Sequence, residues 1–170
     1  IGVNNCAIGN NALSTGQTGS YNCAFGSNAL QNNTVDGNCA FGTNALALNT
    51  TGTNNVAIGT TGLGINTTGY NNVAVGNMAL SINTTGYNNT AVGTNALASS
   101  NSYNNTAFGT NSLQSNKYGY NNCSFGTNAL SSGQTGYNNC AFGSDALKTN
   151  TTGFGNCAFG CQSLNANTSG

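Results

Sequence analysis

Short apolar alternations, separated by polar stretches, recur along the whole chain. Each one is a tripeptide in which Ala, once Ser, stands between two other residues, and a Gly follows it; the first covers residues 6–9. We call the first residue of the tripeptide position 0. Positions 0 and +2 are mostly apolar, and apolar residues at every second position are typical of a strand rather than a helix. Each repeat therefore predicts a short strand with positions 0 and +2 facing a core.

The tripeptide occurs ten times, at intervals of 17 residues that twice shorten to 16. Position −1 is Asn and position +7 is Leu in all ten repeats, and position +2 is always Ile, Val or Phe. A low-complexity polar linker is the alternative interpretation, but linkers do not keep one residue type at one place. Asn-Thr-Thr-Gly segments between the strands supply turn residues. The frequent Ala-Leu at positions +6 and +7 suggests a second extended piece.

A unit of this length cannot bury its own apolar side chains, so we expect successive repeats to stack as coils. At the inter-strand spacing of about 4.8 Å, ten coils form a rod roughly 48 Å long. The sequence thus predicts an all-β fold, a parallel β-solenoid (β-roll or β-helix), in which residues 1–170 form a single continuous solenoid of ten repeats. Because both terminal repeats keep the ordinary pattern, we also expect it to be part of a longer fibre.

Stacking turns every column of the repeat into a ladder. The predicted core ladders occupy positions +2 and +7 and include Phe25, Phe41, Phe108, Phe125, Phe142, Phe159, Leu13, Leu30, Leu46, Leu80, Leu97 and Leu130. Strict alternation would point the Asn at position −1 outward, so its constancy suggests a corner where stacked amides bond to one another. This Asn ladder includes Asn5, Asn22, Asn38, Asn55, Asn72 and Asn89.

Six of the seven cysteines form a ladder at position 0, in two runs of three adjacent coils: Cys6, Cys23 and Cys39, then Cys123, Cys140 and Cys157. Val and Thr fill this column elsewhere, which favours a small buried packing residue. Stacked neighbours also meet the Cα separation of about 4.4–6.8 Å that a disulfide needs, so some disulfides are an alternative, and metal binding is a third. A zinc site is poorly supplied because the chain has no His.

Position −3 is aromatic in six successive coils, and Phe154 follows five tyrosines that form a candidate surface ladder: Tyr70, Tyr87, Tyr103, Tyr120 and Tyr137. Rings repeated at strand spacing can stack. Structural stacking is the first interpretation, and a contact between chains and a sugar-binding platform are the alternatives. Thr at position −5 forms an interrupted ladder, which motivates an ice-binding hypothesis.

The charge and composition exclude several functions. The chain has 2 basic and 2 acidic side chains and no His, so it offers no cationic surface for nucleic acid. It lacks the run of about 18 apolar residues that membrane insertion requires. Asp36 and Asp145 lie six coils apart, near 30 Å by strand spacing, whereas a glycosidase pair needs roughly 5–9.5 Å. We therefore predict no enzymatic activity, no cofactor and no metal.

The repeat resembles the Asn-Ser-(Val/Ile)-Ala-(Ile/Val)-Gly repeats of YadA-like trimeric autotransporter heads, as residues 86–97 illustrate: Gly-Tyr-Asn-Asn-Thr-Ala-Val-Gly-Thr-Asn-Ala-Leu. It is also similar to Asn/Thr/Gly-rich repeats of phage and giant-virus fibres. The resemblance covers the whole chain. It implies a left-handed parallel β-roll that trimerises and binds host or matrix surfaces.

These observations favour a non-enzymatic, structural and adhesive fibre segment located outside the cell or on a cell or virion surface. We expect it to self-associate end to end or laterally, and surface glycans or host matrix are further candidate partners. An ice-binding solenoid that uses the Thr ladder is one alternative. A carbohydrate-binding module that uses the tyrosine ladder is another.

Overall fold

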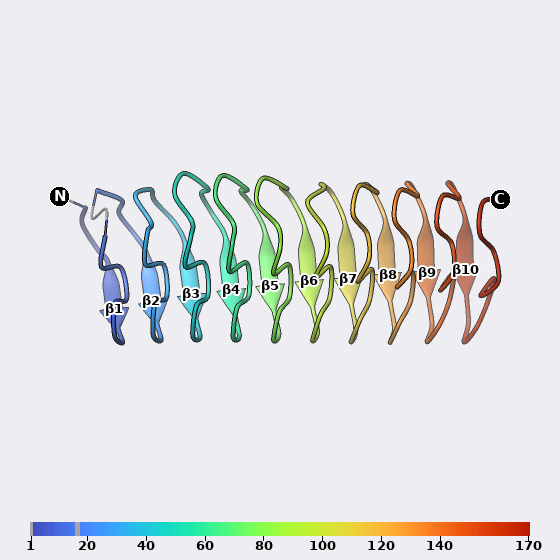
Figure 1. The fold of residues 1–170 in the computed structure, drawn as a ribbon, viewed down its shortest axis with the longest axis horizontal. Coiled ribbons are helices and arrows are strands. Elements are labelled where there is room, and N and C mark those ends of the chain that lie inside the picture. The colour runs from blue at the N-terminus through green and yellow to red at the C-terminus, as the bar shows by residue number, and fades with distance from the viewer. Residues whose placement is uncertain (1, 16–17) are drawn as a thin grey trace.

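The chain forms a rod of stacked coils (Figure 1), and the structure, a computed structural model, describes residues 2–15 and 18–170. All its strands lie in one parallel sheet in chain order, and the described residues contain no helix. The strands are β1 (Cys6–Ile8), β2 (Cys23–Phe25), β3 (Cys39–Phe41), β4 (Val56–Ile58), β5 (Val73–Val75), β6 (Thr90–Val92), β7 (Thr106–Phe108), β8 (Cys123–Phe125), β9 (Cys140–Phe142) and β10 (Cys157–Phe159). The predicted all-β parallel solenoid is confirmed.

Identical positions lie opposite one another in every pairing of neighbouring strands. Position 0 pairs with position 0, as in Val56↔Val73, and position +2 pairs with position +2, as in Ile58↔Val75. The register also holds across the two shortened repeats, where Cys23 pairs with Cys39 and Thr90 with Thr106. A deletion in the turn therefore leaves the strand in place, because the ladder hydrogen bonds fix the strand and not the loop.

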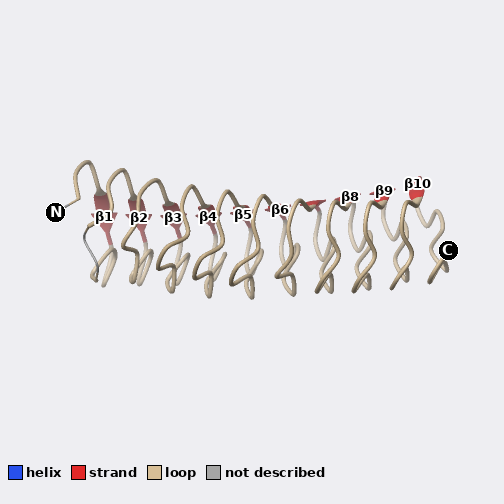
Figure 2. Cartoon of the chain, turned by 90° about the horizontal axis from the view of Figure 1, so that it is seen from above, coloured by secondary structure: helices blue, strands red, loops and turns tan. Residues whose placement is uncertain are grey.

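The strand occupies only one side of each coil, and turns form the rest (Figure 2). The second extended piece predicted at positions +6 and +7 is wrong. Every Leu at position +7 has a left-handed backbone, with φ between 47° and 52°. This part of the coil still pairs with its neighbour, since the amide N–H of Leu97 donates to the carbonyl of Ser112 at 3.0 Å. Left-handed residues bend the chain back toward the strand, which a coil this short needs in order to close.

The Gly at position +3 is required by the stacking itself. Its φ lies between 118° and 137° in all ten coils, a region that side chains of L-residues disfavour. A Cβ added to Gly93 would lie 2.6 Å from the carbonyl carbon and oxygen of Gly109 in the next coil. Any larger residue would therefore push two coils apart.

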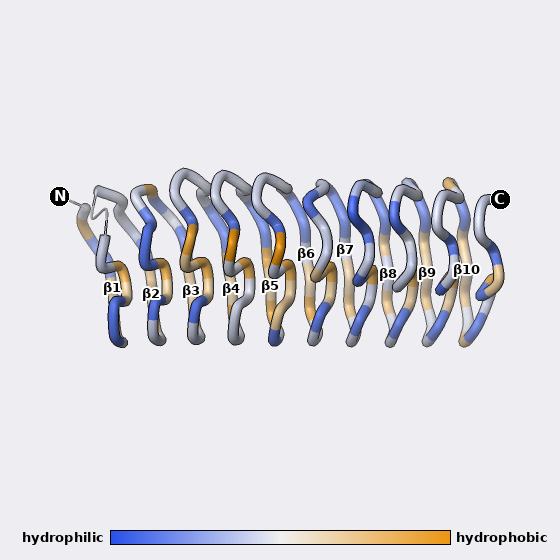
Figure 3. The backbone as a smooth tube through the Cα atoms, viewed as in Figure 1, coloured by the Kyte–Doolittle hydropathy of each residue, from blue (hydrophilic) through white to orange (hydrophobic). Residues whose placement is uncertain are grey.

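The Leu column at position +7 lies in the interior, as predicted, and Figure 3 shows apolar positions recurring at the same place in successive coils. Among the predicted members, Leu13 is 8% exposed and the others are at most 1% exposed: Leu30, Leu46, Leu80, Leu97 and Leu130. The Ala at position +1 packs beside this column, and Ala74 and Ala91 are fully buried. Leu and Ala together form one continuous core along the rod.

The prediction that the Phe column at position +2 belongs to the core is wrong. Phe41 and Phe108 are 37% exposed and Phe159 is 69% exposed, while Phe25, Phe125 and Phe142 are half-buried. The alternation of side chains is real, but its inward face carries positions −1 and +1 and its outward face carries positions 0 and +2. The physical reason is space: a narrow coil already filled by Leu and Asn leaves room beneath the strand for a methyl group only.

Candidate functional site

The outward face of the sheet is an apolar surface two columns wide. Position 0 supplies Cys, Val or Thr, position +2 supplies Phe, Ile or Val, and neither column contains a charged residue. The phenyl rings stack on one another along the rod: Phe25 and Phe41 have centroids 4.8 Å apart, and the rings at Phe108, Phe125, Phe142 and Phe159 are spaced 4.8–5.0 Å. The face is therefore continuous and closely ordered.

The cysteines of position 0 lie on this outward face and not in a buried core, which corrects the first interpretation of that column. Cys23, Cys39, Cys123 and Cys140 are half-buried, while Cys6 and Cys157 are exposed. The reason is again the phase of the alternation, which turns position 0 away from the Leu column. All seven thiols are free, so the alternative of disulfides is not realised in this structure.

Burial makes the four half-buried thiols weak nucleophiles. Partial burial raises the pKa of Cys140 to about 11, and the neighbouring thiols Cys123 and Cys157 contribute in the same direction. Burial likewise raises the pKa of Cys23, Cys39 and Cys123. Because the thiolate is the form that reacts and binds metals, these four thiols are poorly suited to either task at neutral pH. Within residues 2–15 and 18–170 no group of three His, Cys, Asp or Glu residues is arranged to hold a metal ion.

The aromatic column at position −3 is stacked, in agreement with the first interpretation of that column. The centroids of Tyr70, Tyr87, Tyr103, Tyr120 and Tyr137 are spaced 5.0–5.2 Å, and Phe154 continues the row at 5.1 Å. Each inner ring is covered on both faces by its neighbours, with interplanar angles of 2–16°. A sugar that binds by lying on an aromatic face finds no free face on these inner rings, so the arrangement does not favour a carbohydrate platform.

The Asn ladder at position −1 runs inside the coil and not along an outer corner. Asn22, Asn38, Asn55, Asn72 and Asn89 are at most 2% exposed, and only Asn5, in the first coil, is exposed. The amides do bond to one another as expected: the side-chain oxygen of Asn72 accepts from the backbone N–H of Asn89 at 3.0 Å and from its amide nitrogen at 3.2 Å. Asn is needed because one short side chain must donate and accept along the same axis.

A second interior amide ladder, at position +10, was not predicted. Its buried members are Asn33, Asn49, Asn66, Asn83, Asn116 and Asn150. The amide nitrogen of Asn66 donates to the side-chain oxygen of Asn49 at 2.8 Å and to the carbonyl of Gly69 at 2.9 Å. The recurrence of Asn at this position was the available signal, but it lies within Asn-Thr-Thr-Gly segments that resemble simple turns.

This second ladder is interrupted at Gly133, between β8 and β9, and again in the shortened coil between β6 and β7. Ser100 replaces Asn there, and the side-chain oxygen of Asn83 is left without a hydrogen-bond partner. It is the one buried side-chain polar atom of that kind in the described part of the chain. An unpartnered buried acceptor destabilises the fold by about 1–3 kcal/mol.

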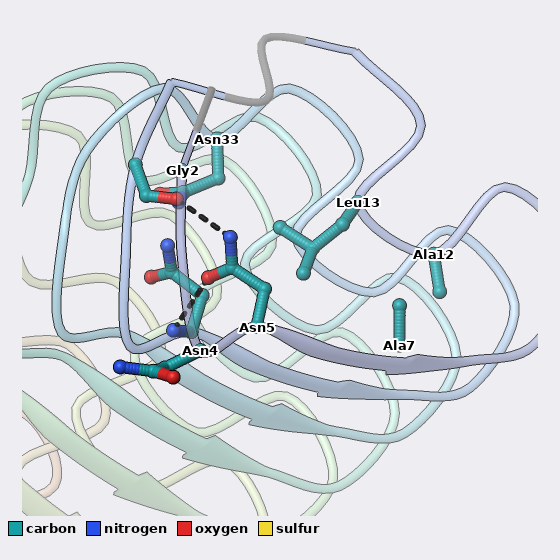
Figure 4. Close-up of a pocket in the computed structure, with 9 residues that line it drawn as sticks. Gly2, Asn4, Asn5, Ala7, Ala12, Leu13 and Asn33 are labelled. Atoms are coloured by element: carbon teal, nitrogen blue, oxygen red, sulfur yellow. Dashed lines mark hydrogen bonds between the residues drawn. The ribbon is translucent and has the colours of Figure 1, made fainter.

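A hollow of about 320 Å³ lies at the first coil (Figure 4). Its lining includes Asn5, Ala7, Ala12 and Leu13, which belong to the same columns that a neighbouring coil covers elsewhere in the rod. The amide of Asn5 donates to the carbonyl of Gly19 at 2.7 Å. None of the described residues that line the hollow has a titratable side chain.

The Thr column at position −5 is exposed in all seven coils that carry it: Thr18, Thr34, Thr51, Thr68, Thr85, Thr135 and Thr152. Several of its hydroxyls are engaged within the rod. Thr18 donates to the carbonyl of Thr34 at 2.8 Å, and Thr34 donates to that of Thr50 at 2.7 Å. The column is interrupted in two adjacent coils by Asn101 and Tyr118, so it does not form an unbroken hydroxyl array for ice.

The carboxylates are separated as the repeat predicts. Asp36 precedes β3, where it accepts a hydrogen bond from the backbone N–H of Ser20 at 2.7 Å. Asp145 follows β9 and pairs with Lys148 at 3.0 Å, and this partner lowers the pKa of Asp145. The two carboxylates therefore have local structural partners and share no site.

Comparison with known protein families, with curated proteins and with solved structures finds no match for this chain. No helix of the described residues is long and apolar enough to cross a membrane.

Proposed function

We propose that this chain is a non-enzymatic structural segment of an extracellular fibre, in which stacked coils form the shaft or the head. The observation that carries the proposal is the register: nine successive strand pairs place the same repeat positions opposite one another, without slippage. A unit that stacks on copies of itself in this way lengthens by adding coils, and each coil needs only its neighbours.

The hydrogen bonds supply the stiffness that a fibre needs. Backbone bonds between coils run along the rod, and both interior amide ladders run parallel to them. A further row of exposed amides at position −2 links Asn71, Asn88, Asn104, Asn121 and Asn138 at 3.1–3.2 Å. Bending or stretching the rod would lengthen many of these bonds at once, so the load is shared among them.

The resemblance of the repeat to trimeric autotransporter heads and to viral fibres supports adhesion as the use of such a segment. The exterior supports it as well, because each outward column presents the same kind of side chain at regular intervals. Multiple weak contacts of one kind along a rod add up when the opposing surface is also repetitive. A host surface or extracellular matrix is therefore the partner class we propose, beside other copies of the chain.

Oriented fibres of the purified chain test the structural part of this proposal. We expect an X-ray reflection at about 4.8 Å along the rod axis, because strands stack in that direction. Electron micrographs should show straight rods of uniform width. Compact particles, or the same reflection perpendicular to the rod axis, would contradict it.

Antibodies against the purified chain test the location. They should label filaments on intact cells or particles of the source without permeabilisation. Labelling that requires permeabilisation would contradict an extracellular fibre while leaving the rod structure unaffected.

A further inference from the structure

Within residues 2–15 and 18–170, no segment buries the outward face of the sheet, and position +2 is half-buried or exposed in every strand. We propose that this face binds the same face of a second copy, with the two rods parallel and in coil-for-coil register. The inference rests on the proposed fibre role and names the partner of one surface of that fibre. It is carried by the area, the neutrality and the size pattern of positions 0 and +2.

The exposed apolar area is large enough for a specific pair. Ten strands at about 4.8 Å and a width of about 12 Å across two columns give roughly 600 Å² on each rod. Two such faces bury roughly 1,200 Å² together, which lies at the lower end of specific protein–protein interfaces. A contiguous apolar patch of this size lies at the upper end of the range found on monomeric proteins, where the largest patch often serves a function.

The charge distribution permits self-association at this face. The four charged side chains, Lys117, Lys148, Asp36 and Asp145, all lie outside positions 0 and +2, and the formal net charge is zero. A charged side chain at position 0 or +2 would oppose contact between two such faces, because the charge would be buried without a partner. Neither column contains a charged residue.

A second copy matches the face better than another fold would. The columns of a second copy repeat at the same spacing along the rod, so every coil of one rod can contact one coil of the other. The sheet face turns gradually about the long axis (Figure 2), and two identical rods can follow the same turn by winding around one another. Each coil then adds the same increment of buried apolar area.

The sizes of the side chains select the parallel arrangement. A half-turn about the long axis reverses the strand direction, so position 0 of one rod faces position +2 of the other. The small column of Cys, Val and Thr then meets the larger column of Phe, Ile and Val, which fills a gap of about 10 Å between sheets evenly. In the antiparallel arrangement Phe would meet Phe and Cys would meet Cys, which crowds one column and leaves a void at the other.

Sedimentation equilibrium tests the face. We expect the purified chain to form dimers, and the variant Phe108→Lys/Phe142→Lys to weaken them by at least about tenfold, because two charges would be buried without partners. The matched control, Thr85→Lys/Thr152→Lys, adds the same charge on the exposed Thr column and should dimerise normally. Circular dichroism verifies that both variants fold.

Two outcomes of this experiment overturn the proposal. A wild-type chain that stays monomeric at all accessible concentrations has no such interface. A face variant that dimerises as well as the control places the interface elsewhere on the rod. In either case rods that still give the axial reflection leave the fibre proposal intact, so the two failures are distinguishable.

Pulsed electron spin resonance tests the orientation. The six cysteines of position 0 are replaced by Val, which β4 and β5 already carry there, and a spin label is attached to the exposed Cys161 in the last coil. Parallel rods place the two labels at the same end, below about 30 Å apart, whereas antiparallel rods place them at opposite ends, above about 40 Å. A long distance overturns the parallel register. Loss of the dimer in this variant also overturns it, because Val should fill the column at least as well as Cys.

Discussion

The interior of the coil and the outward face of the sheet follow different rules, although both are largely apolar. Inside, Asn at position −1 and Leu at position +7 are the same in all ten coils. Outside, position 0 varies among Cys, Val and Thr, and position +2 among Phe, Ile and Val. The constant columns are thus the buried ones, and the bulkiest apolar column is the exposed one.

The difference shows what each region demands of a side chain. An interior amide must donate to one coil and accept from the next, which only one length of side chain can do. An interior Leu must fill a fixed volume from a left-handed backbone. The outward face only requires residues that suit a pleated surface and stack on their neighbours. The choice of residue is therefore restricted more strongly in the interior, by geometry, than on the outward face, where an apolar side chain is enough.

Substitution of the Gly at position +3 should destabilise the interior most. Gly93→Ala introduces a Cβ that would lie 2.6 Å from the backbone of Gly109, at a φ of 133°. We expect the free energy of unfolding to fall by roughly 4 kcal/mol or more, since both strain and a clash between coils contribute. Urea denaturation monitored by circular dichroism measures this change.

Gly62→Ala is the matched control for that substitution. A Cβ there would lie 3.6 Å from the Cβ of Ala57, an ordinary contact, and most other coils carry Ala at this position. We expect its stability to be unchanged or slightly raised. Equal destabilisation by the two substitutions would mean that the close contact between stacked coils is not the reason why position 93 requires Gly.

The amide ladder should be comparable in sensitivity to the Leu column. Asn89→Ala removes the acceptor of the backbone N–H of Asn105 and the donor to the carbonyl of Ser102, both buried. Each orphaned group costs about 1–3 kcal/mol, so the unfolding free energy should fall by roughly 3 kcal/mol. The exposed Asn77 provides the control, and Asn77→Ala should change stability by less than about 0.5 kcal/mol. Similar losses at the two positions would contradict an interior ladder.

The sequence predicts the coils well and the orientation of the strand badly. The fixed interval, the Leu column and the bonding of the amides all follow from the repeat alone. The orientation of the strand does not follow from the repeat, because alternation defines two faces without indicating which one is buried. The bulky Phe at position +2 favours the wrong face. The nearly constant Ala at position +1 is the better guide, since a column restricted in size is a column that packs against something.

The left-handed Leu of position +7 could not be predicted from propensity. Leu disfavours a positive φ, so its residue type indicated an extended segment instead of a turn. The tertiary structure overrides that preference because the Leu side chains stack in the core. Asn at position +10 was hidden for the opposite reason, since Asn is common in turns that bury nothing.

A pair of truncations compares the two regions directly. Leu97→Ala empties the fully buried column and should lower the unfolding free energy by about 2–5 kcal/mol. Phe125→Ala removes a larger side chain but one that is half-buried and stacked between Phe108 and Phe142, so we expect a loss of about 1–2 kcal/mol. Urea denaturation of both variants gives the comparison. A larger loss at Phe125 would place the main core on the outer side of the sheet.

The smallest effect should be a gain in stability, at the place where Ser100 interrupts the second amide ladder. In Ser100→Asn the new amide can donate to the unpartnered oxygen of Asn83, as Asn66 does to Asn49. The other shortened coil holds Asn33 at the same position, with its amide nitrogen 2.7 Å from the carbonyl of Val35, so a coil of this length accommodates the side chain.

We expect the substitution to raise the unfolding free energy by about 1 kcal/mol, the contribution of one satisfied buried acceptor. Ser99→Asn, on the half-buried neighbouring residue, cannot reach the ladder and should leave stability unchanged. Thermal and urea unfolding of the two variants separate these cases. Ser100→Asn would contradict this expectation if it destabilised the chain while Ser99→Asn did not. The shortened coil between β6 and β7 would then have less interior space than the one between β2 and β3. In that case the residue types of the interior columns would depend on coil length as well as on hydrogen bonding.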